Sequence, residues 1–212
     1  MISLEKLDYL PYFTIQSVNQ LTGGSMASTR LLLSRQEEAG KIIRLKRGYY
    51  MAREFWLGNK NDENFIALVS SIIQPHSYLT GAWVLQKYGV MTEGIYAVTA
   101  ATIKHTRSIS NKLANFHYFH IKEKLFIGYT EINFAGIVCR EATAAKALFD
   151  FFYFKSEHPA IRDKRYDLAE DERLNLFDWD NKMKAEFFRL TEKSGSPKMK
   201  RIAVNLQRKI WA

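Results

Sequence analysis

Cysteine, proline and glycine are all scarce in this sequence of 212 residues, which contains one cysteine, four prolines and eleven glycines. The single thiol, Cys139, cannot form an internal disulfide, so the chain is not one of the small secreted folds that disulfides stabilise. The low glycine and proline content excludes collagen-like and low-complexity chains. The reducing cytoplasm is therefore the compartment that we expect.

Long apolar runs are also missing. The first ten residues carry Glu5, Lys6 and Asp8, where a secretory signal would have an uninterrupted apolar segment. The stretch from Phe65 to Gln86 contains no Lys, Arg, Asp or Glu, but it is interrupted by Gln74-Pro75-His76-Ser77, so its apolar pieces are too short to span a bilayer. We expect a soluble protein with no membrane partner. Its hydrophobic fraction of 47% excludes a disordered chain, and its length allows one or two domains.

Positive charge is concentrated in two short segments that contain no acidic residue. Lys41 to Arg53 carries five basic residues, and Lys193 to Ala212 carries six, which together exceed the net charge of +9 of the whole chain. Such clustering on a nearly neutral body indicates local surfaces for anions such as nucleic acid. The alternative is that either segment is a solvated face. For the C-terminal segment, nucleic-acid contact and a solvated face stay equally open.

The N-terminal residues follow the pattern of a helix-turn-helix. Leucines at helical spacing predict a short helix over residues 4–10. Thr14 and Ser25 are candidate N-caps of two further helices, which are separated by a turn at Gly23-Gly24. The last of the three runs to Ala39, and a helix, a short glycine-containing turn and a second helix form the helix-turn-helix motif.

The helix that begins at Ser25 presents a small and polar stripe away from the expected core. Ala27, Arg30 and Ser34 fall on this outer side, whereas the acidic Glu37 and Glu38 come only in the last turn. A helix that reads the major groove with its N-terminal residues needs this distribution. The candidate DNA contacts on this helix are Ser25, Ala27, Ser28, Arg30, Ser34 and Arg35.

A basic β-hairpin follows this helix. Ile42-Ile43 and Tyr49-Tyr50-Met51 are β-prone, and Lys46-Arg47-Gly48 supplies the turn, so the first 53 residues are predicted to form a winged helix-turn-helix. Arg44, Lys46 and Arg47 would lie on the wing and contact phosphates or a minor groove, while Tyr49 packs or touches the DNA backbone. The alternative is a three-helix packing module with a solvated hairpin. DNA binding requires both the hairpin and the outer stripe of the helix to be open to solvent.

The rest of the chain predicts a larger α+β part with a small, mostly antiparallel sheet covered by helices. Residues 53–62 are predicted to be a connector, which gives domains at 1–53 and 62–212. The expected helices are 65–73, 80–88, 141–154, 168–190 (broken near Phe177) and 198–210, and the expected strands are 95–102, 116–121, 126–132 and 137–139.

No catalytic fingerprint is present, since the sequence has neither a P-loop nor a Gly-x-Ser-x-Gly elbow. His117 and His120 lie in a β-prone run, where a spacing of three places their side chains on opposite faces, so we expect no shared metal. Cys139 is interpreted as a small core residue. We therefore predict no catalytic residue, metal site or cofactor.

One enzymatic alternative stays open. Glu131, Glu141 and Asp150, together with Lys146, would be a metal-dependent nuclease cluster if they met in space. Lys146 and Asp150 are also a simple i, i+4 helical pair, and this interpretation requires less.

Three stretches of the sequence resemble the AbiEi-type antitoxins of bacterial abortive-infection, type IV toxin–antitoxin systems. They are EEAGKIIRLKRGYYM (Glu37 to Met51), SYLTGAWVLQKYGVMTEGIYAVTAAT (Ser77 to Thr102) and CREATAAKALFDFFYF (Cys139 to Phe154). The resemblance covers most of the chain, and its motifs are patterns of hydrophobic and small residues. By position, it implies that Ser25 to Arg35 is the recognition helix and Lys41 to Met51 the wing.

This resemblance implies a function for each part. The N-terminal domain would bind repeats in its own promoter on double-stranded DNA and repress transcription. The C-terminal domain would act as an antitoxin against a nucleotidyltransferase toxin, without a stable complex. The sequence thus predicts a cytoplasmic, non-enzymatic repressor and antitoxin. A protein-interaction module without a DNA target is the alternative from another class.

Overall fold

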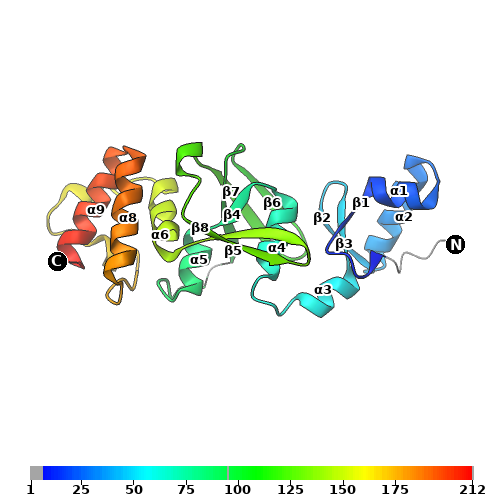
Figure 1. Ribbon diagram of the computed structural model, residues 1–212, viewed down its shortest axis with the longest axis horizontal. Coiled ribbons are helices and arrows are strands. Elements are labelled where there is room, and N and C mark those ends of the chain that lie inside the picture. The colour runs from blue at the N-terminus through cyan, green and yellow to red at the C-terminus, as the bar shows by residue number, and fades with distance from the viewer. Residues whose placement is uncertain (1–6, 95, 212) are drawn as a thin grey trace.

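The computed structural model describes residues 7–94 and 96–211 of an elongated α+β chain. The N-terminal helices and a small sheet lie at one end, a larger sheet lies in the middle, and α8 and α9 lie at the other end (Figure 1). Buried apolar side chains from all three regions belong to one core. Within the described residues, no helix is long and apolar enough to cross a membrane.

Helices and strands are interspersed in the first part of the chain, a run of strands follows, and helices form the C-terminal part. The α-helices are α1 (Ile15–Thr22), α2 (Met26–Glu38), α3 (Arg53–Asn59), α4 (Phe65–Ile73), α5 (Gly81–Lys87), α6 (Ala144–Phe154), α7 (Leu168–Asp171), α8 (Asn181–Ser194) and α9 (Pro197–Lys209). The strands are β1 (Phe13–Thr14), β2 (Ile42–Lys46), β3 (Tyr49–Ala52), β4 (Ser77–Leu79), β5 (Ala97–Thr102), β6 (Arg107–Ser110), β7 (Asn115–His120), β8 (Tyr129–Phe134) and β9 (Ile137–Ala142). Two short 3₁₀ turns lie at Glu123–Leu125 and Pro159–Arg162.

The predicted caps place the N-terminal helices correctly. Thr14 caps α1 by accepting a hydrogen bond from Ser17 N, and Gly23 ends α1 with a left-handed φ of 65°. Ser25 caps α2 in the same way, by accepting from Ser28 N. The helix expected over 4–10 is not confirmed: residues 7–10 form a single turn, and residues 4–6 lie outside the described residues.

The predicted hairpin is present as β2 and β3, and β1 adds a third antiparallel strand in the order β1-β3-β2. Its register contains an irregularity, because Arg44 pairs with Tyr50 while Lys46 pairs with Tyr49. Leu45 therefore has no partner in the ladder and forms a β-bulge. A bulge changes the face toward which the following side chain points, and this affects the function of Lys46.

The larger sheet differs from the prediction. It has six strands in the order β6-β7-β5-β4-β9-β8, and it is mixed rather than small and mostly antiparallel, because β5 pairs with β7 and β4 with β9 in parallel. The prediction missed β4, which has only three residues, and β6, an edge strand with mainly polar side chains. Neither strand has the length or the apolar alternation that marks a strand in sequence.

The segment predicted as a connector is largely helical. Arg53–Asn59 forms α3, because Phe55 is buried and Trp56 packs partly against the core. Asn59 stabilises the end of α3 by donating from Nδ2 to Phe55 O over 2.7 Å. The glycine and asparagines that suggested a linker thus lie in the last turn of a helix and just beyond it.

Helix α4 connects the two sheets. Its residues are nearly all buried, as expected of a helix that is apolar on all sides. On the larger sheet, Tyr118 of β7 donates from its hydroxyl to Ser70 O of α4, while the neighbouring Phe119 stacks on Phe154 of α6. Adjacent residues of a strand point to opposite faces, so α4 and the end of α6 contact opposite faces of the sheet. The other side of α4 packs against β2.

The basic C-terminal helix α9 uses several of its charges to hold the fold. Lys198 Nζ donates to the carbonyls of Tyr153 and Lys155, at and just after the end of α6. Arg201 forms a bidentate ion pair with Glu157. Lys209 Nζ donates to Arg165 O. These contacts favour a structural function for part of the C-terminal basic segment.

A fully buried ion pair lies within α6 and is connected to β4 by a hydrogen bond. Lys146 Nζ lies 2.7 Å from Asp150 Oδ1, and both side chains are 0% exposed. Asp150 Oδ2 also accepts hydrogen bonds from Tyr78 Oη and Thr80 Oγ1. Burial lowers the pKa of Lys146, and its attraction to Asp150 opposes this change. The hydroxyl groups of Tyr78 and Thr80 thus replace part of the water that burial removes from Asp150.

Removal of one member of this pair should therefore be costly. We expect Lys146→Met to lower the free energy of unfolding by about 3–5 kcal/mol, because it leaves a buried carboxylate without its cation. Urea denaturation measures this loss. The matched control is Arg165→Met, which removes one partner of the exposed Arg165–Asp163 pair and should change stability by less than about 1 kcal/mol. Equal effects of the two substitutions would contradict the importance of the buried pair.

Candidate nucleic-acid interface

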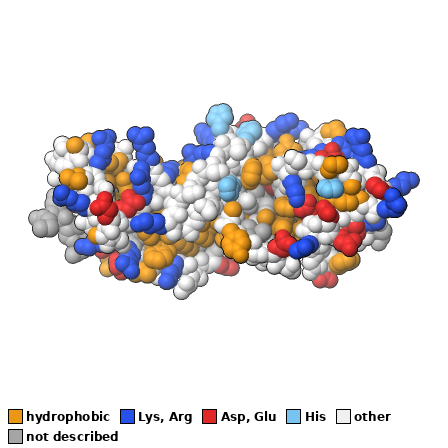
Figure 2. All heavy atoms as spheres, turned by 180° about the vertical axis from the view of Figure 1, so that it is seen from behind, with side chains coloured by type: hydrophobic (Ala, Val, Ile, Leu, Met, Phe, Trp, Pro, Cys, Tyr) orange, Lys and Arg blue, Asp and Glu red, His pale blue; other side chains and the backbone are white. Residues whose placement is uncertain are grey.

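A basic groove lies between α2 and the β2–β3 hairpin. It encloses about 610 Å³, and Arg30 of α2 faces it together with Arg44 and Arg47 of the hairpin. Within the described residues, no hydrogen bond or ion pair engages these three guanidinium groups. Figure 2 shows basic side chains gathered over the N-terminal part, at the left of that view, with a smaller acidic group among them. The groove therefore presents unpaired positive charge to solvent.

The outer stripe of α2 is open, as the sequence predicts. Ala27, Arg30 and Ser34 are all exposed, whereas Thr29 and Leu33 on the opposite side are buried. Arg30 and Ser34 both line the groove. The core side of α2 faces α1 and the hairpin, so the helix is held with its small polar residues outward.

The remaining predicted residues of α2 are placed differently. Arg35 is exposed but does not line the groove. Ser25 and Ser28 are exposed, and their hydroxyls already make hydrogen bonds within the N-cap. Glu37 lines the far end of the groove, and Glu38 accepts a hydrogen bond from Ser34 Oγ. The N-terminal half of α2 is consequently the half with favourable charge for an anion.

Asn19 fixes the angle between α1 and α2, and sequence reasoning missed it. Its Nδ2 donates to Gly24 O over 2.7 Å in the turn and to Thr29 Oγ1 over 2.9 Å in α2. Thr29 is 1% exposed, so this contact is one of the few polar links inside the N-terminal core. The only signal in the sequence was a polar residue next to the buried Val18 on a short helix.

Lys46 does not point into the groove, in contrast to its predicted position on the wing beside Arg44. The bulge at Leu45 reverses the alternation, so Lys46 shares a face with its ladder partner Tyr49. Its Nζ lies 3.9 Å from the centre of the Tyr49 ring and donates to Ile73 O, the carbonyl of the last residue of α4. Tyr49 itself stacks on Tyr12. Both residues therefore belong to the junction with the body of the protein.

A second hollow lies on the other side of the hairpin tip. It encloses about 580 Å³ between the hairpin and the turn that joins β6 to β7, and Arg44 and Arg47 line it as well as the first groove. Lys46 and Glu37 also line this second hollow, and Lys112 adds a basic side chain from the β6–β7 turn. The tip of the hairpin lies between the two hollows. On the side of α1 it is held by a hydrogen bond that Ile15 N donates to Gly48 O. Gly48 has a φ of 77°, which a residue with a side chain adopts only under strain.

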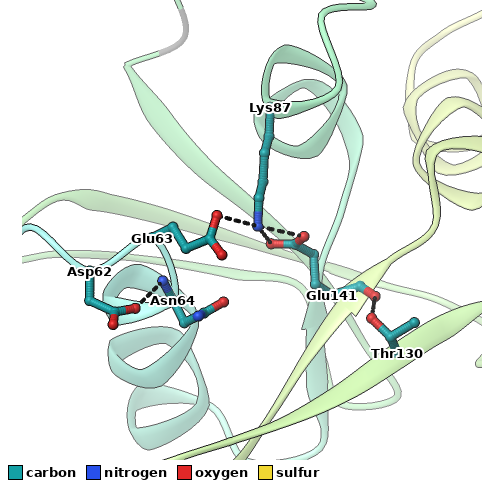
Figure 3. A network of polar contacts seen from close by, with 6 residues as sticks. All are labelled: Asp62, Glu63, Asn64, Lys87, Thr130 and Glu141. Atoms are coloured by element: carbon teal, nitrogen blue, oxygen red, sulfur yellow. Dashed lines mark hydrogen bonds and ion pairs between the residues drawn. The ribbon is translucent and has the colours of Figure 1, made fainter.

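The carboxylates of the alternative nuclease cluster do not meet. Glu131 pairs with Arg140, and Asp150 pairs with Lys146. Glu141 is held by Lys87 of α5, whose Nζ also lies 3.9 Å from Glu63 (Figure 3). Each acid therefore has a different basic partner, and the described residues contain no group of three potential ligands close enough to share a metal ion.

The histidines and the cysteine also have separate contacts. His117 Nδ1 lies 2.7 Å from Ser108 Oγ, and His120 Nδ1 lies 3.0 Å from Lys104 O, so the two rings face different neighbours. Cys139 is buried, and burial raises the pKa of its thiol. This confirms the interpretation of Cys139 as a core residue.

The sequence matches no protein-family model and no curated protein.

The link between α1 and α2 can be tested by removing the Asn19 amide. We expect Asn19→Ala to lower the free energy of unfolding by about 1–2 kcal/mol, since it deletes two hydrogen bonds at the turn. Thermal or urea denaturation measures the effect. Gln20→Ala is the control, because Gln20 is exposed on the same helix and its replacement by alanine brings a gain in helix propensity no larger than that of Asn19→Ala. An Asn19→Ala variant as stable as the control would show that the two hydrogen bonds of Asn19 do not stabilise the junction of α1 and α2.

Proposed function

We propose that residues 13–52 form a winged helix-turn-helix that binds double-stranded DNA in the groove between α2 and the β2–β3 hairpin. The observation that carries the proposal is the convergence of Arg30, Arg44 and Arg47 on one open groove. Two of these arginines come from the hairpin and one from the helix, so a duplex would touch both elements at once. Guanidinium groups suit both phosphates and guanine edges.

The two elements have different functions in this proposal. Arg30 lies among small exposed residues near the N-terminal end of α2, where it can reach base edges without steric obstruction. Arg44 and Arg47 lie on the hairpin and neutralise phosphates, which positions the domain without reading sequence. The N-terminus of α2 adds partial positive charge on the same side. Glu37 and Glu38 at the other end of α2 repel phosphates and orient the duplex.

We further propose that the chain is a transcriptional repressor and antitoxin of a type IV toxin–antitoxin operon. The support is the resemblance of three stretches to AbiEi-type antitoxins, two of which lie in the body of the protein. In this proposal the N-terminal groove represses the promoter of the chain's own operon, and the C-terminal part counteracts a nucleotidyltransferase toxin. The antitoxin activity can be tested by comparing the growth of cells that express such a toxin in the presence and in the absence of residues 62–212.

A protein-interaction module is the second candidate, favoured by apolar side chains that are exposed on α1 and α2. Leu31 of α2 is 52% exposed and Leu21 of α1 is 45% exposed. These two residues would be the contacts of a protein partner. Such a module would bind no duplex at any salt concentration, so one titration separates the two candidates.

The phosphate contacts can be counted from the salt dependence of binding. We expect Arg44→Gln with Arg47→Gln to weaken binding to every duplex and to reduce the slope of log K against log salt by about two, since each lost phosphate contact contributes about 0.9. Arg30→Ala should instead reduce the preference for one sequence over another. Fluorescence anisotropy with a random duplex and a promoter duplex, at several salt concentrations, measures both quantities.

Lys122→Gln with Lys124→Gln is the control for this experiment. Both lysines are exposed and lie outside both hollows, and their removal changes the net charge by the same amount as the double arginine substitution. An unchanged slope in the double arginine variant would contradict the phosphate contacts. Failure of the parent protein to bind duplex even at low salt would contradict DNA binding itself.

A further inference from the structure

Two cations from distant parts of the chain share one carbonyl at the end of α4. Lys46 Nζ, at the end of β2, donates to Ile73 O over 2.8 Å, and Arg107 Nη2, at the start of β6, donates to the same oxygen over 3.0 Å. The hairpin and the edge of the larger sheet therefore meet at a single atom. This arrangement joins the element with the candidate DNA contacts to the body of the protein.

The carbonyl of Ile73 is suited to this function. The last four carbonyls of a helix have no partner within the helix, and they carry its partial negative charge. No basic residue of α4 itself lies in its last turn, so Lys46 and Arg107 supply the missing donors. Burial lowers the pKa of Lys46, and the nearby charge of Arg107 lowers it further. A lysine placed for phosphate contact would instead be solvated and would have a free ammonium group.

A third hydrogen bond fixes the hairpin beside this point. The bulge leaves Leu45 outside the ladder, and its carbonyl accepts from Asn111 Nδ2 of the β6–β7 turn over 3.0 Å. The side chain of Leu45 is 0% exposed. The same bulge thus turns Lys46 toward α4 and presents a backbone acceptor to the body, while Arg44 and Arg47 stay exposed.

We infer that Lys46 is a positioning residue, which together with Arg107 clamps the β2–β3 hairpin to the C-terminal end of α4 and so fixes the groove relative to the body. The clamp itself does not depend on the proposed DNA-binding function, whereas its effect on affinity rests on that function. Lys46 contributes to affinity by keeping the hairpin in its binding orientation, since a preorganised surface loses less entropy on binding. It does not count as one of the phosphate contacts.

The structural content can be tested without DNA. Spin labels at Gln20→Cys and Glu123→Cys, two exposed positions in the N-terminal part and the body, report the distance between them in a Cys139→Ala background. We expect a narrow distance distribution in the parent and a clearly broader one in the Lys46→Met, Arg107→Met double variant. A Lys46→Arg, Arg107→Met variant keeps a donor at the end of the side chain of residue 46. Its distance distribution should be narrower than that of the Lys46→Met, Arg107→Met variant. Lys164→Met, which removes an exposed charge far in sequence from both labels and outside the clamp, should leave the distribution unchanged. Equal distributions in the parent and the double variant would overturn the clamp.

The salt dependence of DNA binding separates a clamp from a phosphate contact. We expect Lys46→Met to weaken binding to a random duplex by about three- to tenfold with the salt slope of the parent, as the loss of one hydrogen bond within the protein would do. Arg47→Gln should lower the slope by about one. A Lys46→Met variant that lowers the slope as Arg47→Gln does would make Lys46 a phosphate contact and overturn the inference. If the parent binds no duplex, the proposed function fails, and the spin-label distances still decide the clamp.

Discussion

The placement of α4 between the two sheets is the constraint on which the rest of the structure depends. Because α4 is apolar on nearly every side, it must be covered by the larger sheet and also by β2. Covering it with β2 brings the hairpin against the body and buries Leu45. The bulge at Leu45 then makes this burial compatible with an exposed Arg44 on the preceding position. The hairpin can thus pack on one side and present charge on the other.

The sequence predicted those parts of the fold that local signals determine. The Thr14 and Ser25 caps, the left-handed Gly23 and the apolar run of α4 are all readable within a few residues, and all are confirmed. The prediction failed where contacts between residues far apart in the sequence determine the secondary structure. The three residues of β4 form a strand only because β5 and β9 lie on either side of them, and α3 is a helix because the core accepts Phe55.

The candidate site shows the same division. Helical periodicity correctly placed Arg30 and Ser34 outward, because the face of a regular helix follows from spacing alone. The prediction placed Lys46 on the wing with Arg44 and Arg47, and in a regular strand Lys46 and Arg44, two residues apart, would share a face. A bulge adds one residue to that count, and no local pattern announces it. Asn19 was missed for a related reason, because its two partners are set by the angle between helices rather than by sequence neighbours.

The most direct test of the account is the effect of duplex DNA on the backbone amide signals of the isotopically labelled protein in solution NMR. The account predicts shifts that concentrate in the first turns of α2 and at the tip of the hairpin around Arg47, and that weaken as salt is added. It also predicts that signals from α8 and α9 stay in place. Shifts confined to α8 and α9, or no shift in α2 and the hairpin at low salt, would contradict DNA binding in the groove.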